Sequence, residues 1–125
     1  MNTYKHHKLT RTIIKGYYEV YNELGTGFLE SVYEEALLMV LRDELALETV
    51  AQKAVEVEFR NKVVGNYQAD LLVENKVIVE LKAVSRLLPS HKAQLINYLK
   101  ATEIELGLLM NFGDEPEFKR YIFDK

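Results

Sequence analysis

Apolar side chains recur every three or four residues through the first third of the chain, which is the spacing of one face of a helix. The first stripe predicts a helix from about Tyr4 to Leu24 that ends at Gly25. The second predicts a helix that ends near Leu45, with Thr26 as a candidate N-cap. The apolar positions are Leu9, Ile13, Tyr17, Val20 and Leu24 in the first helix and Leu29, Val32, Tyr33, Ala36, Leu37, Val40 and Leu41 in the second.

The middle of the chain changes to alternating and β-branched patterns, which are typical of strands. Val50 to Phe59 alternates apolar with charged side chains and predicts a strand with one face in water. Val63 to Val73 and Val77 to Val84 are rich in valine and predict two more strands. The turns Arg60-Asn61-Lys62 and Glu74-Asn75-Lys76 join the three strands into an antiparallel meander.

The last part of the chain predicts one helix and two strands. Pro89-Ser90 opens a helix that runs from His91 to about Thr102. Leu106 to Phe112 predicts a buried strand, and Phe118 to Phe123 predicts a short edge strand. This order predicts an α/β fold, a mixed β-sheet flanked by helices, with residues 1–125 forming a single domain. Because another copy could cover the apolar edge strand, we also expect a homodimer.

Composition narrows the class of protein. The chain has 125 residues, of which 48% are hydrophobic and 28% charged, as expected of one soluble domain. It has no cysteine, which excludes disulfides and thiolate zinc sites. No apolar run approaches the roughly 20 residues that cross a bilayer, and the segment Met1 to Arg11 is polar. We therefore expect a cytoplasmic protein that does not enter the membrane.

The charge is unevenly distributed along the chain. The net charge of −3 argues against a general binder of polyanions. The segment from Lys82 to Thr102, however, contains basic residues and no acidic residue. A second segment with excess positive charge is Met1 to Val20, where Lys5 to Lys15 is interpreted as a solvated helix face. The basic residues of the first segment are Lys82, Arg86, Lys92 and Lys100.

Three charged side chains interrupt the two most apolar strands. Glu80 and Lys82 lie two residues apart, so they share one face of their strand, with Cα atoms about 6 to 7 Å apart. Asp70 lies in the preceding strand, and the tight turn between the strands can bring it alongside Glu80. We therefore expect the three charges to converge on one patch.

This patch has two interpretations from the residue types alone. Burying carboxylates among valines costs several kcal/mol each unless they are compensated, and one lysine satisfies two carboxylates poorly. A divalent cation, Mg²⁺ or Mn²⁺, would compensate both through hard oxygen ligands. Alternatively, Lys82 forms a salt bridge with Glu80 or Asp70.

Three motifs in this sequence resemble those of known nucleases. Asp70, nine intervening residues and Glu80-Leu81-Lys82 resemble the PD-(D/E)XK signature of restriction-endonuclease-like nucleases, with Gln68-Ala69 where a proline usually precedes the aspartate. Gly27 to Tyr33 is similar to the motif of the GxxExxY protein family, a branch of that superfamily. Gln94 to Tyr98 resembles the QxxxY helix of its RecB-like members. The three motifs occur in the expected order and cover nearly the whole chain.

The resemblance implies a metal site and its chemistry. Asp70, Glu80 and the backbone carbonyl of Leu81 would coordinate Mg²⁺ or Mn²⁺, and Glu30 would bind the metal directly or through water. Lys82 would hold or deprotonate the attacking water and neutralise charge on the scissile phosphate. For Glu30, the alternative is an acid favoured by the positive end of the helix dipole.

The same resemblance implies contacts on the third helix. Gln94 and Tyr98 are four residues apart, share one helical face, and could reach the lysine, the water or a phosphate. Tyr98 could instead pack its ring in the core. The basic residues Arg86, Lys92 and Lys100 would line the cleft and contact the phosphate backbone of a nucleic acid.

These observations lead to the hypothesis of a metal-dependent nuclease that hydrolyses phosphodiester bonds in nucleic acid, with DNA as the expected substrate. Two alternatives stay open at this point. The chain could bind nucleic acid or a protein partner on the same fold without cutting it, or it could be a structural module whose polar trio is a salt-bridge cluster.

Overall fold

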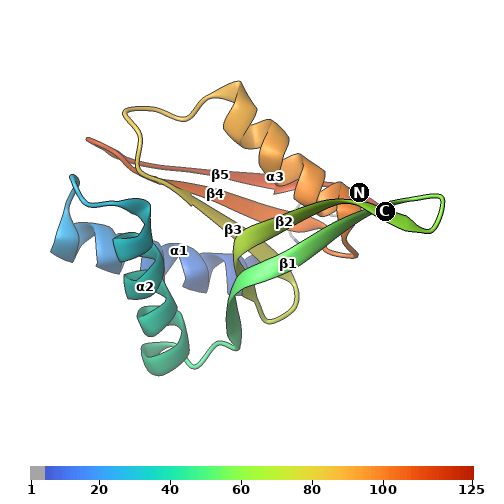
Figure 1. Ribbon diagram of the computed structural model, residues 1–125. Helices are drawn as coiled ribbons and strands as arrows, with labels where there is room; N and C mark the ends of the chain where they lie inside the picture. The colour runs from blue at the N-terminus through green and yellow to red at the C-terminus, as the bar shows by residue number, and fades with distance from the viewer. Residues whose placement is uncertain (1–4) are drawn as a thin grey trace.

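The computed structural model describes residues 5–125, which form a five-stranded sheet with helices on both faces (Figure 1). The elements follow the predicted order of two helices, three strands, one helix and two strands. The predicted helix start at Tyr4 lies outside the described residues, and the helix begins at His7. The elements are α1 (His7–Leu24), α2 (Glu30–Met39), η1 (Val40–Glu44, a π-helical turn), β1 (Thr49–Phe59), β2 (Lys62–Val73), β3 (Val77–Lys82), α3 (Pro89–Ala101), β4 (Leu106–Phe112) and β5 (Pro116–Ile122).

The sheet is mixed, with the strand order β1-β2-β3-β4-β5. β3 and β4 are parallel because α3 carries the chain back across the sheet between them, whereas the other neighbouring strands are antiparallel. β4 is buried at all of its positions, and β5 is an edge strand, as predicted. This mixed sheet flanked by helices confirms the predicted fold class. Pairing of the β5 edge with a second copy stays a prediction.

Two apolar layers lie on opposite faces of the sheet. α1 and α2 cover one face and α3 covers the other (Figure 1). The core under α1 and α2 includes Ile13, Tyr17, Tyr33, Leu37, Leu41, Val79, Leu108 and Phe112. The core under α3 includes Val55, Leu72, Ile78, Leu95, Leu99 and Leu109.

A glycine in β4 lets α3 pack closely on the sheet. A Cβ atom at Gly107 would lie only 2.8 Å from the side chain of Leu95, which is fully buried. A larger residue at this position would therefore push α3 outward. The helix carries the residues that face the charged strands, so this contact fixes their distance from β3.

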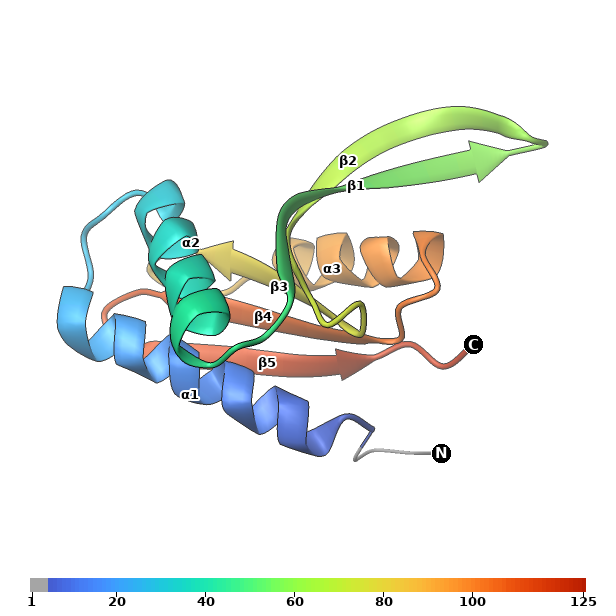
Figure 2. The same cartoon turned by 90° about the horizontal axis from the view of Figure 1, so that it is seen from below.

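β1 and β2 extend beyond the rest of the sheet as a two-stranded arm, defined here as residues 53–69 (Figure 2). Its turn residues Arg60 and Asn61 both have left-handed φ values, 53° and 65°, as a two-residue type I′ hairpin requires. Val55 is buried under α3, but Phe59 at the tip is 58% exposed. The expectation that one face of this strand is buried is therefore wrong at the tip, because the arm extends past α3 into solvent.

The start of α2 differs from the prediction. The helix begins at Glu30 with Leu29 as N-cap, so the assignment of Thr26 as N-cap is wrong. Thr26 instead lies in a loop and donates a long hydrogen bond of 3.4 Å to the carbonyl of Phe112. The hydroxyl of Tyr33 holds this loop, because it donates to the carbonyl of Gly25 at 2.7 Å and accepts from the Phe28 N–H at 3.2 Å.

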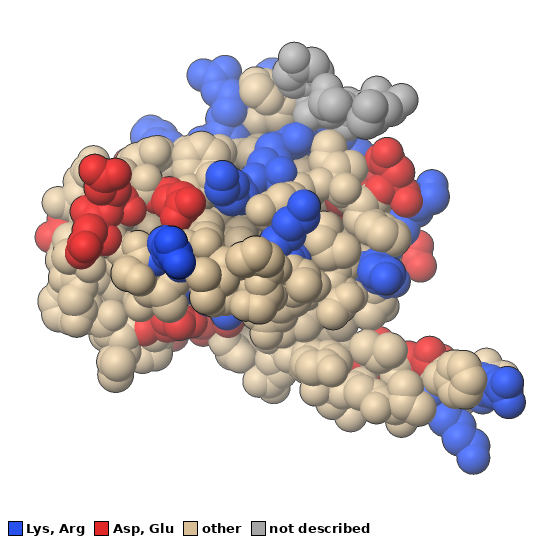
Figure 3. Space-filling view, turned by 90° about the horizontal axis from the view of Figure 1, so that it is seen from above, with Lys and Arg blue, Asp and Glu red and all other residues tan. Residues whose placement is uncertain are grey.

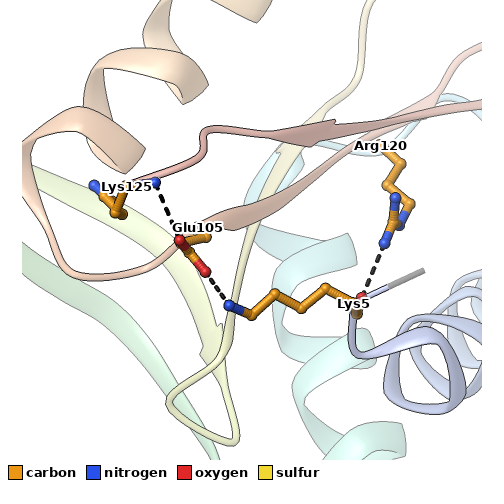
Figure 4. Close-up of polar contacts among 4 residues, drawn as sticks. All are labelled: Lys5, Glu105, Arg120 and Lys125. Carbon is orange, nitrogen blue, oxygen red and sulfur yellow. Dashed lines mark hydrogen bonds and ion pairs between the residues drawn. The ribbon is translucent and has the colours of Figure 1, made fainter. Parts of the chain in front are cut away.

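Contacts near the two chain ends lie at the end of the sheet where β4 begins and β5 ends (Figure 4). Glu105 binds the ammonium of Lys5 and accepts the backbone N–H of Lys125 at 3.1 Å. Arg120 donates to the carbonyl of Lys5 at 2.9 Å. These contacts fasten the first described residues to β5 and to the start of β4. Among the described residues, every helix is too short or too polar to cross a membrane.

Candidate functional site

The backbone ladder between β2 and β3 stops one residue before the predicted acidic pair. Its last backbone partners are Leu71 and Val79, so Asp70 lies opposite Glu80. The Asp70 N–H donates to Oε2 of Glu80 at 2.7 Å, and the Leu81 N–H donates to Oδ2 of Asp70 at 2.8 Å. The two carboxylates thus take the place of carbonyl acceptors where the strands separate. Each has one oxygen fixed by the backbone and a second oxygen that can bind a ligand.

Burial controls the electrostatics of this pair. Glu80 is 3% exposed, and its burial, reinforced by the nearby charge of Asp70, raises the pKa of its carboxyl to about 8. Burial also raises the pKa of Asp70, against the hydrogen bond from Leu81 and the charge of Lys82, which favour the ionised form. The protein therefore holds two carboxylates in a place that disfavours their negative charge.

Lys82 does not compensate this charge by direct contact. Its ammonium donates to Oε1 of Gln94 on α3 at 3.1 Å. Within residues 5–125, no ion pair joins Lys82 to Asp70 or Glu80. The structure therefore does not contain the salt bridge that was the alternative interpretation of the trio. It brings the lysine, the two acids and Gln94 together in one place.

Tyr98 lies one helical turn after Gln94, on the same face of α3. Tyr98 is 4% exposed and belongs to the core under α3. Its ring therefore packs in the core, which was the alternative interpretation from the sequence. Burial and then the charges of Glu80 and Asp70 raise the pKa of its hydroxyl to about 12, opposed by a hydrogen bond with Gln94. Tyr98 is thus a neutral hydroxyl beside the acidic pair.

Two glutamates of α2 act electrostatically on the acidic pair. Glu30 in the first turn is exposed, and its charge is the smallest of the causes that raise the pKa of Glu80. Glu34 is half-buried, and its Oε1 accepts a hydrogen bond of 2.7 Å from the side-chain amide of Gln52. The same amide nitrogen lies 3.5 Å from Oδ1 of Asp70.

Sequence reasoning missed both Glu34 and Gln52. The position of Glu34, four residues after Glu30, could have identified it, because residues at this spacing share a helical face. Gln52 gave no signal, since a polar residue on an exposed strand position is ordinary. Its importance depends on a backbone conformation that the residue type does not encode, a left-handed φ of 52°.

The basic residues of the predicted surface lie on different sides of α3. Lys100 lines a groove of about 540 Å³ between α3 and the arm, together with Tyr67 and Asn97 and with two acidic residues of the arm, Glu56 and Glu58. The ring of Tyr67 lies 5.9 Å from that of Tyr98, the tyrosine beside the acidic pair. Lys92 does not line this groove, and its ammonium lies 5.1 Å from the ring centre of Tyr121 on β5.

Arg86 lies in the loop between β3 and α3, and a buried asparagine holds this loop. The side chain of Asn111 accepts the Val84 N–H at 3.0 Å and donates to the Val84 carbonyl at 2.9 Å. Asn111 is 1% exposed, so these two bonds satisfy a polar group inside the core. Figure 3 views the α3 side and shows basic side chains spread over this face and at the tip of the arm.

The donor set fits a small divalent cation. Among the described residues, no set of three or more histidine, cysteine, aspartate or glutamate side chains is arranged to hold a metal. Mg²⁺, however, is usually held by one or two carboxylates, with water and substrate phosphate filling the remaining positions. The second oxygens of Asp70 and Glu80 meet that requirement, and within residues 5–125 no cationic side chain forms an ion pair with the buried Glu80.

A mixed sheet flanked by helices, with an aspartate on one strand and a glutamate and lysine on the next, is the architecture of a nuclease-like α/β domain. The sequence model of the PD-(D/E)XK nuclease superfamily matches residues 7–121, and the chain belongs to this superfamily. The narrower similarity to the GxxExxY branch stays a prediction.

Among the solved structures that match the chain is one with a similar fold. It is titled "Crystal structure of SSO0001", with 22% sequence identity and a TM-score of 0.56. The match covers 76% of this chain and 51% of that one, so this chain spans about half the length of the protein it resembles. At this identity the likeness concerns the fold alone. No curated protein matches the chain.

Proposed function

We propose that this chain is a nuclease that requires a divalent metal and hydrolyses phosphodiester bonds in nucleic acid, with DNA as the expected substrate. One observation carries the proposal. A buried Glu80 and a half-buried Asp70 lie side by side, each with one carboxylate oxygen fixed by a backbone N–H group, while the neighbouring Lys82 binds Gln94 instead of either acid. This arrangement is costly for a structural cluster and suited to a site that receives a cation and a phosphate.

Asp70 and Glu80 would hold Mg²⁺ or Mn²⁺ with the backbone carbonyl of Leu81. When bound, the cation would supply Lewis acidity toward the scissile phosphate and lower the pKa of a coordinated water. The hydrogen bonds from the backbone of Leu81 and Asp70 fix the orientation of both carboxylates before the ion arrives. This preorganisation reduces the ordering that binding requires.

Lys82 would hold the attacking water, or take its proton, and offset charge on the phosphate as it forms. The hydrogen bond to Gln94 orients the ammonium without neutralising it, because an amide oxygen carries no net charge. Tyr98 remains protonated near neutral pH and can donate its hydroxyl hydrogen to a phosphate oxygen. Glu30 would act at longer range, through water.

Nucleic-acid contact is the expected role of the basic residues nearby. Lys100 in the groove and Arg86 in the loop after β3 would contact the phosphate backbone on either side of the site. Lys92 points toward β5 and would contribute only through its longer-range charge. Membership in the nuclease superfamily supports nucleic acid as the partner, and the choice of DNA is part of the proposal.

The test measures cleavage of labelled single-stranded DNA, duplex DNA and RNA with Mg²⁺, with Mn²⁺ and with EDTA. Wild type is expected to cut at least one DNA form only when a divalent metal is present. Lys82→Met, which removes the ammonium and keeps most of the side-chain volume, is the matched control and should bind the same substrate without cutting it. Wild type that binds nucleic acid but cuts none of the substrates would favour the non-catalytic binding module. A Lys82→Met variant that cuts at the wild-type rate would contradict the proposed role of the lysine.

A further inference from the structure

The tip of the arm, defined here as residues 59–64, is basic. From Phe59 to Ala69 the chain contains Arg60 and Lys62 and no acidic residue. Both basic side chains are exposed, and within residues 5–125 neither forms an ion pair. Figure 3 shows basic side chains at the end of the arm, clear of the body of the molecule. The tip therefore offers two positive charges to a ligand that lies beside the protein.

The turn at the tip contains a residue that its backbone conformation disfavours. Arg60 and Asn61 have left-handed φ values of 53° and 65°, which a type I′ turn requires at both positions. Asparagine and glycine adopt this conformation readily, whereas a long side chain such as arginine rarely does. The sequence thus gives up turn stability at Arg60 and gains a guanidinium at the outermost point of the arm. Backbone strain that places a charge at an exposed tip is an indication of function.

Apolar side chains surround the two charges. The ring centre of Phe59 lies 4.9 Å from the guanidinium carbon of Arg60, which is a cation–π contact. Val63 and Val64 are also exposed. In the major groove of DNA, arginine and asparagine bind the edges of bases, and apolar side chains contact the methyl group of thymine. The tip combines these kinds of side chain with a second cation, Lys62, that can bind a phosphate.

The arm also has a suitable shape and length. A two-stranded β-ribbon fits the major groove of B-DNA, which is about 12 Å wide. A β-bulge between Val57 and Glu58 shifts the register of the ribbon, and the arm curves away from the sheet (Figure 2). Asn61 lies nine residues before Asp70 on the chain. This spacing spans at most about 30 Å, or about nine base pairs of duplex. One duplex can therefore contact the acidic pair and the tip together.

We propose that the tip of the arm binds the major groove of duplex DNA while the acidic pair holds the strand that is cut. The inference rests on the proposed function and names duplex DNA as the substrate class. Two acidic residues of the arm, Glu56 and Glu58, line the groove beside α3. Charge complementarity to phosphate is therefore confined to the tip.

The experiment measures binding of a labelled 24-base-pair DNA duplex by fluorescence anisotropy at several salt concentrations, in the Lys82→Met background to prevent cleavage. Arg60→Asn combined with Lys62→Gln should weaken binding by about tenfold and reduce the salt dependence by about two released ions. Arg11→Gln combined with Lys15→Gln is the matched control, because it removes the same charge from exposed positions of α1. The control should change the affinity by less than about threefold.

Two single variants separate binding from folding and from overall charge. Arg60→Asn places a favoured residue in the turn, so the melting temperature without DNA should equal or exceed that of wild type while duplex affinity falls. A purely structural role for Arg60 predicts a lower melting temperature with unchanged affinity. Phe59→Ala should weaken duplex binding by about threefold and leave the salt dependence unchanged, since it removes no phosphate contact.

The outcomes distinguish the inference from the proposed function. Tip variants that bind the duplex as tightly as their background would overturn the inference, and metal-dependent cleavage by wild type would leave the proposed function standing. Weaker duplex binding by the tip variants of a chain that cuts no substrate would support the tip contact and overturn the nuclease function. If wild type sediments as a dimer and Phe59→Ala as a monomer, with duplex affinity unchanged, the tip binds a second copy of the chain and the inference is wrong.

Discussion

The two halves of β2 differ sharply in their surroundings. Its last residues, Leu71 to Val73, are buried and pair with β3, whereas most residues from Lys62 to Gln68 are exposed and pair only with β1 in the arm. Asp70 lies at the boundary between the two halves. The N–H groups that lose their ladder partners at this boundary hold the acidic side chains instead. The comparison indicates that the acidic pair lies where β2 separates from β3. Buried N–H groups that lose a strand partner at this point must find another acceptor, and the two carboxylates supply it.

The buried half and the arm also differ in what they contribute. The buried half fills two apolar cores. The arm exposes large apolar side chains, among them Val63, Val64 and Phe59, and forms one wall of the groove beside α3. Stability is therefore expected to depend on β3 and β4, while substitutions in the arm should affect binding more than folding.

The largest effect is expected at the boundary itself. Asp70→Asn keeps an oxygen acceptor for the Leu81 N–H and removes a negative charge beside Glu80. Without metal, its melting temperature should equal or exceed that of wild type. Cleavage should fall by about two orders of magnitude or more. Mg²⁺ at about 100 times its Kd should stabilise wild type by about 2.7 kcal/mol and the variant much less. Thermal melts with and without Mg²⁺ measure this, and a destabilised variant in a metal-insensitive protein would show the trio to be structural.

Stability should separate the two regions next. Leu108→Ala, in the fully buried β4, removes atoms from the core and should cost about 2 to 5 kcal/mol of unfolding free energy. Val64→Ala, at a position in the arm that is 62% exposed, should change it by no more than about 0.5 kcal/mol. Urea unfolding of both variants gives the comparison. Equal losses would mean that the arm is part of the folding core.

The pH dependence of stability should reveal the buried acid. The pKa of Glu80 is about 8 in the folded protein and 4.5 as its ordinary value, so the folded state binds this proton more tightly. The contribution is fully present below pH 4.5 and is lost as pH rises through 8. The metal-free protein should lose on the order of a few kcal/mol between these limits.

Glu80→Gln should remove most of this dependence, because the amide does not titrate, and Glu35→Gln should leave it unchanged. Urea unfolding at a series of pH values measures the slope. Added Mn²⁺ should oppose the loss at high pH, since the cation binds the ionised carboxylates. A flat profile in wild type would contradict the burial of an ionisable Glu80.

Sequence alone predicted the order of the elements because the signals for it are local. The apolar spacing of α1, the turn Glu74-Asn75-Lys76 and the continuous apolar run of β4 each depend on neighbouring residues. The assignment of Thr26 as a helix cap was wrong because two other residues hold that loop. Tyr33 is in the next helix, and Phe112 is distant in the sequence.

The candidate site was only partly visible in the sequence. Asp70, Glu80 and Lys82 follow from strand alternation and a short turn, and the structure brings them together. The contact of Lys82 with Gln94 depends on how α3 packs over the sheet, and the contact of Gln52 with Glu34 depends on a left-handed backbone conformation. Neither property is encoded in local periodicity, because both depend on contacts between segments that are distant in the chain.

The smallest expected effect compares two lysines of α3. Lys100 lines the groove beside the arm, whereas the ammonium of Lys92 lies over the ring of Tyr121 on β5. Lys100→Glu and Lys92→Glu make the same charge change at two exposed positions of α3, so the two variants have equal net charge. If nucleic acid lies in the groove, Lys100→Glu should weaken binding several-fold more than Lys92→Glu and reduce the dependence of affinity on salt by about one released ion. Fluorescence anisotropy with a labelled oligonucleotide at several salt concentrations, using the Lys82→Met background to prevent cleavage, measures both quantities. Equal effects of the two substitutions would mean that the substrate senses only the overall charge of α3 and takes a path outside the groove.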